Sequence, residues 1–303
     1  AGRDGGVQSA KLGFGASQAG GAGIAKLPGR MTGFVSGGVD RTSSSYGGNQ
    51  LYGSQGGWHM AMGLEMPLGD KGAFGTAAGI SEGESTPNGD SNRSRTTMAA
   101  AYAAMPLGDG FYVGGLVSAE SSRASTDRRA TDGSSMLRLS GATDATRYAA
   151  TVEAGFEKSI GRGLTLNPRA QLGYSHYKLG GFSEEGGETA LKLEDVTVSR
   201  VEARLGARLE GKTSVAGLAM TPHLSADYVS LLSGRELGAT VRFAVAPGQA
   251  MYLPIATSGA AWGELRGGVT FGDGPLTLGL SGQHATGGDM VDRRAEAELR
   301  FRF

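Results

Sequence analysis

The chain has 303 residues with no cysteine, 54 glycines, and equal numbers of acidic and basic residues, 29 of each. The balanced charge argues against nucleic-acid binding, and the lack of cysteine excludes disulfides, thiolate zinc sites and cysteine nucleophiles. The sequence contains no run of about 18 apolar residues, so it predicts no transmembrane helix. Its low mean hydropathy does not exclude barrel strands, because lipid-facing and lumen-facing residues alternate along them.

The N-terminal region lacks a clear element. Ala1-Gly2-Arg3-Asp4 has no signal peptide, so we expect a mature or truncated chain. Glycines such as Gly20 and Gly21 disfavour a long stable helix, since each costs about 1 kcal/mol relative to alanine. We therefore expect residues 1–30 to form a linker or a segment that enters a barrel lumen.

From residue 31 onward, apolar residues recur with the period of two that is typical of strands. Several runs have the length of about 9–11 residues that a bilayer-spanning strand needs. The runs number about twelve and lie near 31–42, 58–68, 72–82, 94–106, 111–123, 146–160, 164–178, 193–211, 216–233, 258–272, 275–285 and 294–303.

Two of these runs show the alternation most clearly. In Val201 to Glu210, every second residue is Val, Ala or Leu, and the residues between are Glu, Arg or Gly. In the last nine residues, Leu299, Phe301 and Phe303 alternate with arginine and glutamate. Each strand therefore has one apolar and one charged face, as in a barrel wall between lipid and lumen.

The connections alternate between short and long. Short Gly/Asp turns occur at 69–72, 108–110, 161–163, 211–216 and 272–274. Long polar connections are expected at 43–57, 83–93, 124–145, 179–192, 233–257 and 286–293. Outer-membrane barrels have short periplasmic turns and long extracellular loops, so the pattern predicts such a barrel with both termini on the periplasmic side.

The charged positions of these strands are expected to line the lumen, because a charge that faces lipid costs about 2–4 kcal/mol at the midplane. We interpret them as a mutually neutralising network that holds the barrel open, with a selectivity filter or passenger-guiding track as the alternative. Mixed sign argues against strong ion selectivity. The set comprises Glu153, Glu157, Arg169, Arg200, Glu202, Arg204, Arg208, Asp227, Glu264, Arg266, Glu296, Glu298, Arg300 and Arg302.

Catalytic patterns are weak, and we predict no enzyme, no cofactor and no resident metal. Gly79 to Gly83 matches the G-x-S-x-G pattern but lacks the strand–turn–helix context that its chemistry requires. His223, Ser225 and Asp227 share one strand face, but residues two apart lie about 6.6 Å from each other, too far for a triad. Acidic pairs at 184–185 and 194–195 are interpreted as solvated loop charge, with a calcium site as an alternative.

Four segments together resemble the translocator domain of classical monomeric autotransporters (type V secretion). They are Leu166 to Tyr174 followed by Gly181 to Glu184, Ser199 to Arg208, Leu218 to Leu224, and the terminal Glu298 to Phe303. The terminal segment is similar to the signal that the barrel-assembly machinery reads, which assigns that role to Leu299, Phe301 and Phe303. No Asn precedes Asn49, so the paired-Asn self-cleavage of one branch of the family has no counterpart here.

The resemblance implies an all-β, twelve-stranded antiparallel transmembrane barrel at residues 31–303, with residues 1–30 threading its lumen. It also implies secretion of an upstream passenger domain across the bacterial outer membrane by a monomer in contact with lipid. A passive outer-membrane channel or porin is the first alternative, and a barrel-type surface hydrolase is the second.

Overall fold

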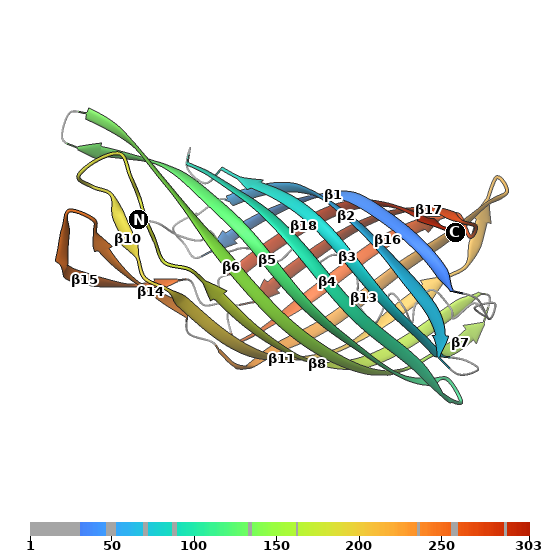
Figure 1. The fold of residues 1–303 in the computed structure, drawn as a ribbon. Helices are drawn as coiled ribbons and strands as arrows, with labels where there is room; N and C mark the ends of the chain where they lie inside the picture. The colour runs from blue at the N-terminus through green and yellow to red at the C-terminus, as the bar shows by residue number, and fades with distance from the viewer. Residues whose placement is uncertain are drawn as a thin grey trace.

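The structure, a computed structural model, describes residues 31–46, 53–68, 72–86, 90–132, 135–161, 163–234, 237–255, 260–287 and 290–303. Nearly all of these residues are in β-strands (Figure 1). The expectations for residues 1–30 and for the turn at 69–71 lie outside the described residues. In the described part of the chain, no helix is long and apolar enough to cross a membrane.

Twelve long strands form one antiparallel sheet that closes on itself through the pairing of β8 with β11. The short strands β7 (Lys158–Gly161) and β12 (Thr213–Val215) extend it at one end. The twelve are β1 (Thr32–Tyr46), β2 (Gly53–Leu68), β3 (Gly72–Ser85), β4 (Ser91–Gly108), β5 (Phe111–Asp132), β6 (Ser135–Phe156), β8 (Leu164–Leu179), β11 (Val196–Gly211), β13 (Leu218–Ser233), β16 (Ala261–Phe271), β17 (Leu276–Gly287) and β18 (Met290–Arg302).

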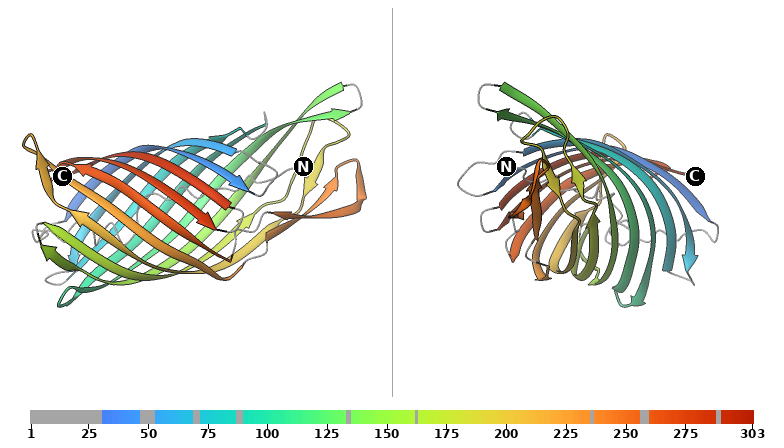
Figure 2. Two further views of the ribbon diagram at one scale, coloured as in Figure 1. Left: turned by 180° about the vertical axis from the view of Figure 1, so that it is seen from behind. Right: turned by 60° about the vertical axis from the view of Figure 1, so that its left-hand side comes forward.

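The predicted all-β, twelve-stranded barrel is confirmed. Each long strand pairs with its neighbour in sequence, and β18 pairs with β1, with Phe34 opposite Arg302. The strands run obliquely around the barrel, and β1 begins at the end where the chain ends (Figures 1 and 2). Because the number of strands is even, the start of β1 and the end of β18 lie at the same end of the barrel.

Tight turns connect the strands at this end, called here the short-turn end. The turn between β4 and β5 consists of Gly108, Asp109 and Gly110, all at positive φ (105°, 52° and 88°). A Cβ on Gly110 would lie 2.4 Å from the carbonyl oxygen of Glu157, so the position also requires the close approach that glycine permits. The hairpin predicted at 211–216 turns slightly later, at Ala216 and Gly217.

The opposite end, called here the long-loop end, is more ordered than the sequence suggests. The prediction of a loop at 124–145 is wrong, because β5 and β6 continue to Asp132 and Ser135 as one paired hairpin. These extensions are rich in serine, threonine and charged residues, and their buried leucine, Leu139, does not face outward, so the outward apolar alternation of the barrel wall does not mark them.

Two other predicted loops form a small sheet beside the hairpin. Strands β9 (Phe182–Ser183), β10 (Leu191–Leu193), β14 (Leu237–Phe243) and β15 (Ala246–Ile255) pair in the order β15-β14-β10-β9. Its core is formed by Val196, Ala239 and Val241, which are at most 5% exposed. Because Val196 is the first residue of β11, the small sheet packs its apolar residues against the end of the barrel wall.

The barrel is inside-out compared with a water-soluble protein. Many large apolar side chains are exposed, for example Leu205 at 65% and Tyr228 at 60%. Its buried residues include Glu153 at 1%, Arg169 at 8% and Asp227 at 8% exposure. An apolar exterior around a charged interior is what a lipid environment requires.

Candidate functional site

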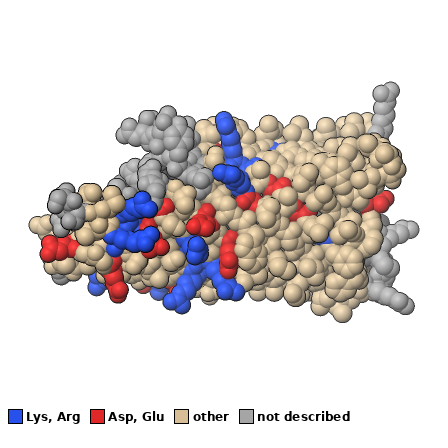
Figure 3. Space-filling model, turned by 90° about the horizontal axis from the view of Figure 1, so that it is seen from above, with Lys and Arg blue, Asp and Glu red and all other residues tan. Residues whose placement is uncertain are grey.

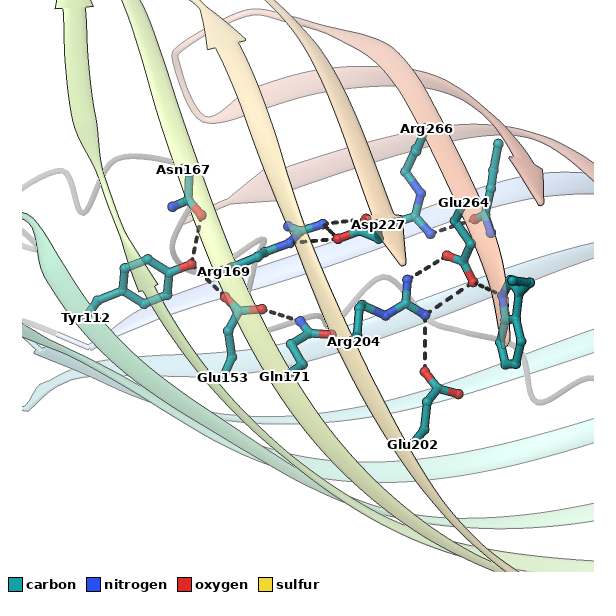
Figure 4. Close-up of polar contacts among 12 residues, drawn as sticks. Tyr112, Glu153, Asn167, Arg169, Gln171, Glu202, Arg204, Asp227, Glu264 and Arg266 are labelled. Atoms are coloured by element: carbon teal, nitrogen blue, oxygen red, sulfur yellow. Dashed lines mark hydrogen bonds and ion pairs between the residues drawn. The ribbon is translucent and has the colours of Figure 1, made fainter. Parts of the chain in front are cut away.

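The candidate site is the charged interior of the barrel, shown in part in Figure 4. All fourteen residues predicted to face the lumen are buried or partly buried. On β11, for example, Arg204 and Arg208 are shielded, while Leu205 and Leu209, each the next residue along the strand, are exposed. The structure therefore places the predicted charges on the strand faces opposite the apolar exterior.

The most buried ion pair joins β8 to β13 across β11. The Arg169 guanidinium donates from Nη2 to both carboxylate oxygens of Asp227, at 3.1 and 3.0 Å. The intervening β11 residue, Gly206, is in register with both. A Cβ on Gly206 would lie 2.2 Å from Asp227 Oδ1, so the glycine is what lets the two side chains meet.

A second pair connects β11 with β16. Arg204 donates from Nη1 to Glu264 Oε2 at 2.6 Å, and its Nη2 donates to Glu202 Oε1 at 3.2 Å. The indole Nε1 of Trp262 donates to Glu264 Oε1 at 2.9 Å. Nearby, Arg266 Nη2 donates to the side-chain oxygen of Gln283 at 2.6 Å. Charges from neighbouring strands thus neutralise one another along this wall.

A third group surrounds Glu153. The Tyr112 hydroxyl lies 2.8 Å from Glu153 Oε1 and 3.0 Å from Asn167 Oδ1, and Gln171 donates to Glu153 Oε2. The Tyr112 ring lies over Gly155, its direct register partner on β6. A Cβ added to Gly155 would lie 2.4 Å from the Tyr112 hydroxyl oxygen. Close packing of an aromatic ring on a glycine of the next strand positions the hydroxyl for the carboxylate.

The C-terminal strand carries a looser set of charges. Arg294 lies 3.7 Å from Asp40 and 3.8 Å from Glu296, and Arg300 lies 3.6 Å from Glu298. The Arg300 guanidinium also stands 5.3 Å from the centre of the Phe34 ring. These contacts connect β18 with β1, where the barrel begins and ends.

The structure does not bring all predicted residues into the ion-pair network. Arg208 pairs with Glu210 at 3.0 Å, which the predicted set lacks, and Glu157 is only 3.5 Å from the amide nitrogen of Asn167. Arg200 and Arg302 share the interior face of their strands. Among the described residues, neither arginine has a carboxylate oxygen within 4.0 Å of its guanidinium nitrogens.

Several interior residues were missed by sequence reasoning. Arg147 pairs with Glu120 at 3.1 Å, and Tyr102 donates to Glu65 at 2.6 Å. Glu120 is an odd number of residues away from the outward Val113 and Val117, so the alternation along the strand predicts that it faces inward. Tyr102 and Tyr112 were not recoverable in that way, because aromatic residues in such strands are expected on the lipid side.

At the long-loop end, a clamp connects the β5–β6 hairpin to the small sheet. Arg128 donates to both carboxylate oxygens of Glu184, at 3.0 and 2.6 Å, and the hydrogen bond to Glu184 holds the pKa of Arg128 above its usual range. The carboxylate of Asp195 accepts a bond from the Gly181 backbone N–H at 2.7 Å. This bond, with Lys178 nearby, lowers the pKa of Asp195.

The discounted catalytic patterns lie within regular strands. Gly79 to Gly83 is in the middle of β3, paired with β4, without the turn that would present a nucleophile. Asp227 is bound by Arg169 and is not oriented toward His223. Among the described residues, no group of three or more His, Asp or Glu could hold a metal ion.

The predicted assembly-signal residues lie on the exterior of β18. Leu299 is 51%, Phe301 47% and Phe303 70% exposed. The rings of Phe301 and Phe303 stack with centroids 6.0 Å apart. They form an apolar aromatic edge at the short-turn end.

A closed antiparallel barrel with an apolar exterior and a charged interior defines an outer-membrane β-barrel. Comparison identifies its family, because residues 33–283 match the model of the autotransporter β-domain. The chain belongs to that family. It is an outer-membrane translocator domain, which anchors in the membrane and mediates secretion of an upstream passenger. Domains of this family are non-enzymatic barrels.

Solved structures show the same fold at low sequence identity. The translocator domain of NalP from Neisseria meningitidis has a TM-score of 0.71 and 15% identity, over 95% of this chain and 94% of that chain. The β-domain of BrkA from Bordetella has a TM-score of 0.61 and 16% identity, over 89% and 98%. The Pseudomonas putida toluene transporter TodX reaches 0.51 and 8%, over 91% and 89%. No curated protein matches the sequence.

Proposed function

We propose that the passenger leaves through this barrel with both barrel termini in the periplasm and the long-loop end outside. The observation that carries this proposal is the closed ring of strands whose charges are buried and whose apolar side chains face outward. A polar interior accommodates an extended hydrophilic chain, whereas the apolar exterior anchors the domain in lipid. Residues 1–30 would then thread the interior and connect the passenger to β1.

The interior charge network would keep the barrel from collapsing while leaving a wall without net preference for one sign. Arg169 with Asp227 and Arg204 with Glu264 are neutral pairs across strands. A passenger sequence of either charge therefore meets a partner of opposite sign without a ring of repulsive charge.

The barrel surface supports two further parts of the proposal. Closure of the sheet leaves no unpaired barrel edge for a second copy, which favours a monomer in lipid. The exposed aromatic edge of Phe301 and Phe303 is accessible to the barrel-assembly machinery before insertion. We therefore assign Leu299, Phe301 and Phe303 to recognition by that machinery.

The test is an epitope fused before Ala1 in intact Gram-negative cells that express the chain behind a signal peptide. We expect external protease to remove the epitope while the barrel still migrates as a folded, heat-modifiable species. An epitope that stays protected while the barrel is folded would contradict export. Steady conductance after deletion of 1–30, with no passenger displayed, would instead support the channel alternative.

A further inference from the structure

The apolar exterior of β4 and β5 ends abruptly in arginine. From the short-turn end, the outward residues of β5 are Phe111, Val113, Val117 and Ala119, followed by a serine and then Arg123. On β4 the outward series likewise runs through alanines to a threonine and then Arg95. On the face in Figure 3, charged side chains gather in the half toward the long-loop end.

Three arginines lie together at this boundary. Arg95 on β4 and Arg123 on β5 are direct register partners. Arg93 is the register partner of Ser125, two residues beyond Arg123 on the same face, so Arg93 lies diagonal to Arg123. Directly opposed residues have Cβ atoms about 4.5–5.5 Å apart, so three arginine side chains leave the outer face of the sheet close to one another. Arg93, Arg95 and Arg123 are called here the arginine seam.

The fold itself gains little from the arginine seam. Like charges directly opposite one another destabilise a sheet. The carboxylates of Glu82 and Glu84, on the flanking strand β3, stand 3.7 and 3.6 Å from Arg95 and Arg93, and both arginine side chains are at least 65% exposed. These ion pairs are longer than hydrogen bonds and both arginine side chains are largely exposed, so their guanidinium groups remain accessible from outside the barrel.

Aromatic residues mark the level of the seam as the membrane interface. Tyr148, 57% exposed, is the register partner of Ala119, the last apolar outward residue of β5. Trp58, 38% exposed, is the register partner of Glu82. Tyr and Trp gather at the headgroup level of membranes. Arg95 lies in the same register row as Trp58, through Glu82, and Arg123 lies two outward positions beyond Ala119.

We propose that the arginine seam binds the phosphate groups of a phosphorylated glycolipid in the outer leaflet. The inference rests on the orientation proposed above, which places the long-loop end outside. Guanidinium forks bind phosphate oxygens bidentately, and such contacts would replace the exposed pairs that Arg95 and Arg93 make with their β3 register partners. On β6, the register partner of Arg123 is Asp144. The acyl chains of the lipid would lie on the alanine-rich outer faces of β4 and β5 beneath it.

The test uses the folded, full chain in detergent, titrated with diphosphorylated glycolipid and monitored by native mass spectrometry. Each arginine at an anionic membrane surface contributes a factor of about five in affinity. The variant R95Q/R123Q should therefore bind about 25-fold more weakly than the unaltered chain. R95K/R123K keeps the charge but loses the fork geometry, and should bind with an intermediate affinity.

The hairpin provides a matched control. Arg129 and Arg138 are also outward, exposed, direct register partners, but they lie six residues farther along β5. R129Q/R138Q should bind the glycolipid as tightly as the unaltered chain, and heat-modifiable migration should show that every variant is folded.

Three results would overturn the proposal. They are unchanged binding by R95Q/R123Q, equal binding of the glycolipid after its phosphates are removed, and displacement of the lipid by an equal concentration of inorganic phosphate. The last would indicate a free-anion site. Binding in detergent does not depend on which way the barrel inserts, so failure here is distinguishable from failure of the export assay.

Discussion

The ion pair between Arg169 and Asp227 should stabilise the barrel more than any exposed pair, because both side chains are almost inaccessible, at 7% and 5% exposure. The substitution Asp227→Asn would leave the Arg169 guanidinium buried beside a neutral amide. Removal of one partner of a buried ion pair typically costs about 3–5 kcal/mol. Exposed pairs such as Arg93 with Glu84, 3.6 Å apart, should contribute only about 0–1 kcal/mol.

The same pair can be perturbed without altering any charge. Gly206→Ala would place a methyl group 2.2 Å from Asp227 Oδ1 and 2.4 Å from the Ala226 carbonyl oxygen, so the carboxylate must turn away and the strands must shift. The matched control is Gly173→Ala, on the neighbouring strand β8. There the nearest atoms would lie 3.6 Å away or farther, which is ordinary contact.

The assay is urea unfolding of the barrel in lipid vesicles, with linear extrapolation to water and a double-mutant cycle of R169Q, D227N and R169Q/D227N. We expect a loss of about 3–5 kcal/mol for D227N, recovery of part of it in the double variant, and a loss for Gly206→Ala but not for Gly173→Ala. Stabilities of both single variants within about 0.5 kcal/mol of the unaltered chain, or strictly additive losses, would refute the reasoning.

Three further predictions concern the exterior, the interior and the long-loop end. Leu205→Arg should cost about 2–4 kcal/mol in vesicles if this 65% exposed residue faces lipid; an effect no larger than that of Leu205→Ala would contradict lipid contact. Tyr112→Phe should cost about 1–3 kcal/mol, because it removes the hydroxyl from the buried Glu153 carboxylate; unchanged urea midpoints would show that the contact is dispensable. The lowered pKa of Asp195 means that its bond to the Gly181 N–H is present above the unfolded pKa of about 3.9 and lost only as pH falls through the lower folded pKa. The protection of the Gly181 amide, taken as its hydrogen-exchange rate relative to the intrinsic rate at the same pH, should therefore persist at pH 3.9 and be lost at lower pH, whereas loss of protection at or above pH 3.9 would oppose this.

The sequence predicts the membrane-spanning part of the fold well because lipid imposes a physical pattern on it. Leu205 and Leu209 must face outward and Arg204 and Arg208 inward, so parity alone fixes both faces of β11. Beyond the lipid this constraint disappears, which is why the sequence pattern predicts a loop where the hairpin extends to Asp132.

The pairing of interior residues could not be predicted in the same way. Parity shows that Arg169 and Asp227 face inward, but their contact spans 58 positions in sequence and depends on the register of β8, β11 and β13. The role of Gly206 follows from that register alone. A glycine that alternates with charged residues looks like any small interior position until its two neighbours are known.

The measurement that tests the central claim most directly is labelling of two single-cysteine variants in intact cells with a membrane-impermeant maleimide. The chain contains no other cysteine, so any label on the chain itself reports the introduced residue. Gly2→Cys tests the N-terminal segment, and Asp273→Cys tests the turn between β16 and β17 at the short-turn end. Export of the N-terminus through a barrel with its short turns in the periplasm predicts labelling at position 2 and protection at position 273 until the cells are lysed. Protection at position 2 in a folded barrel, or labelling at position 273, would contradict it.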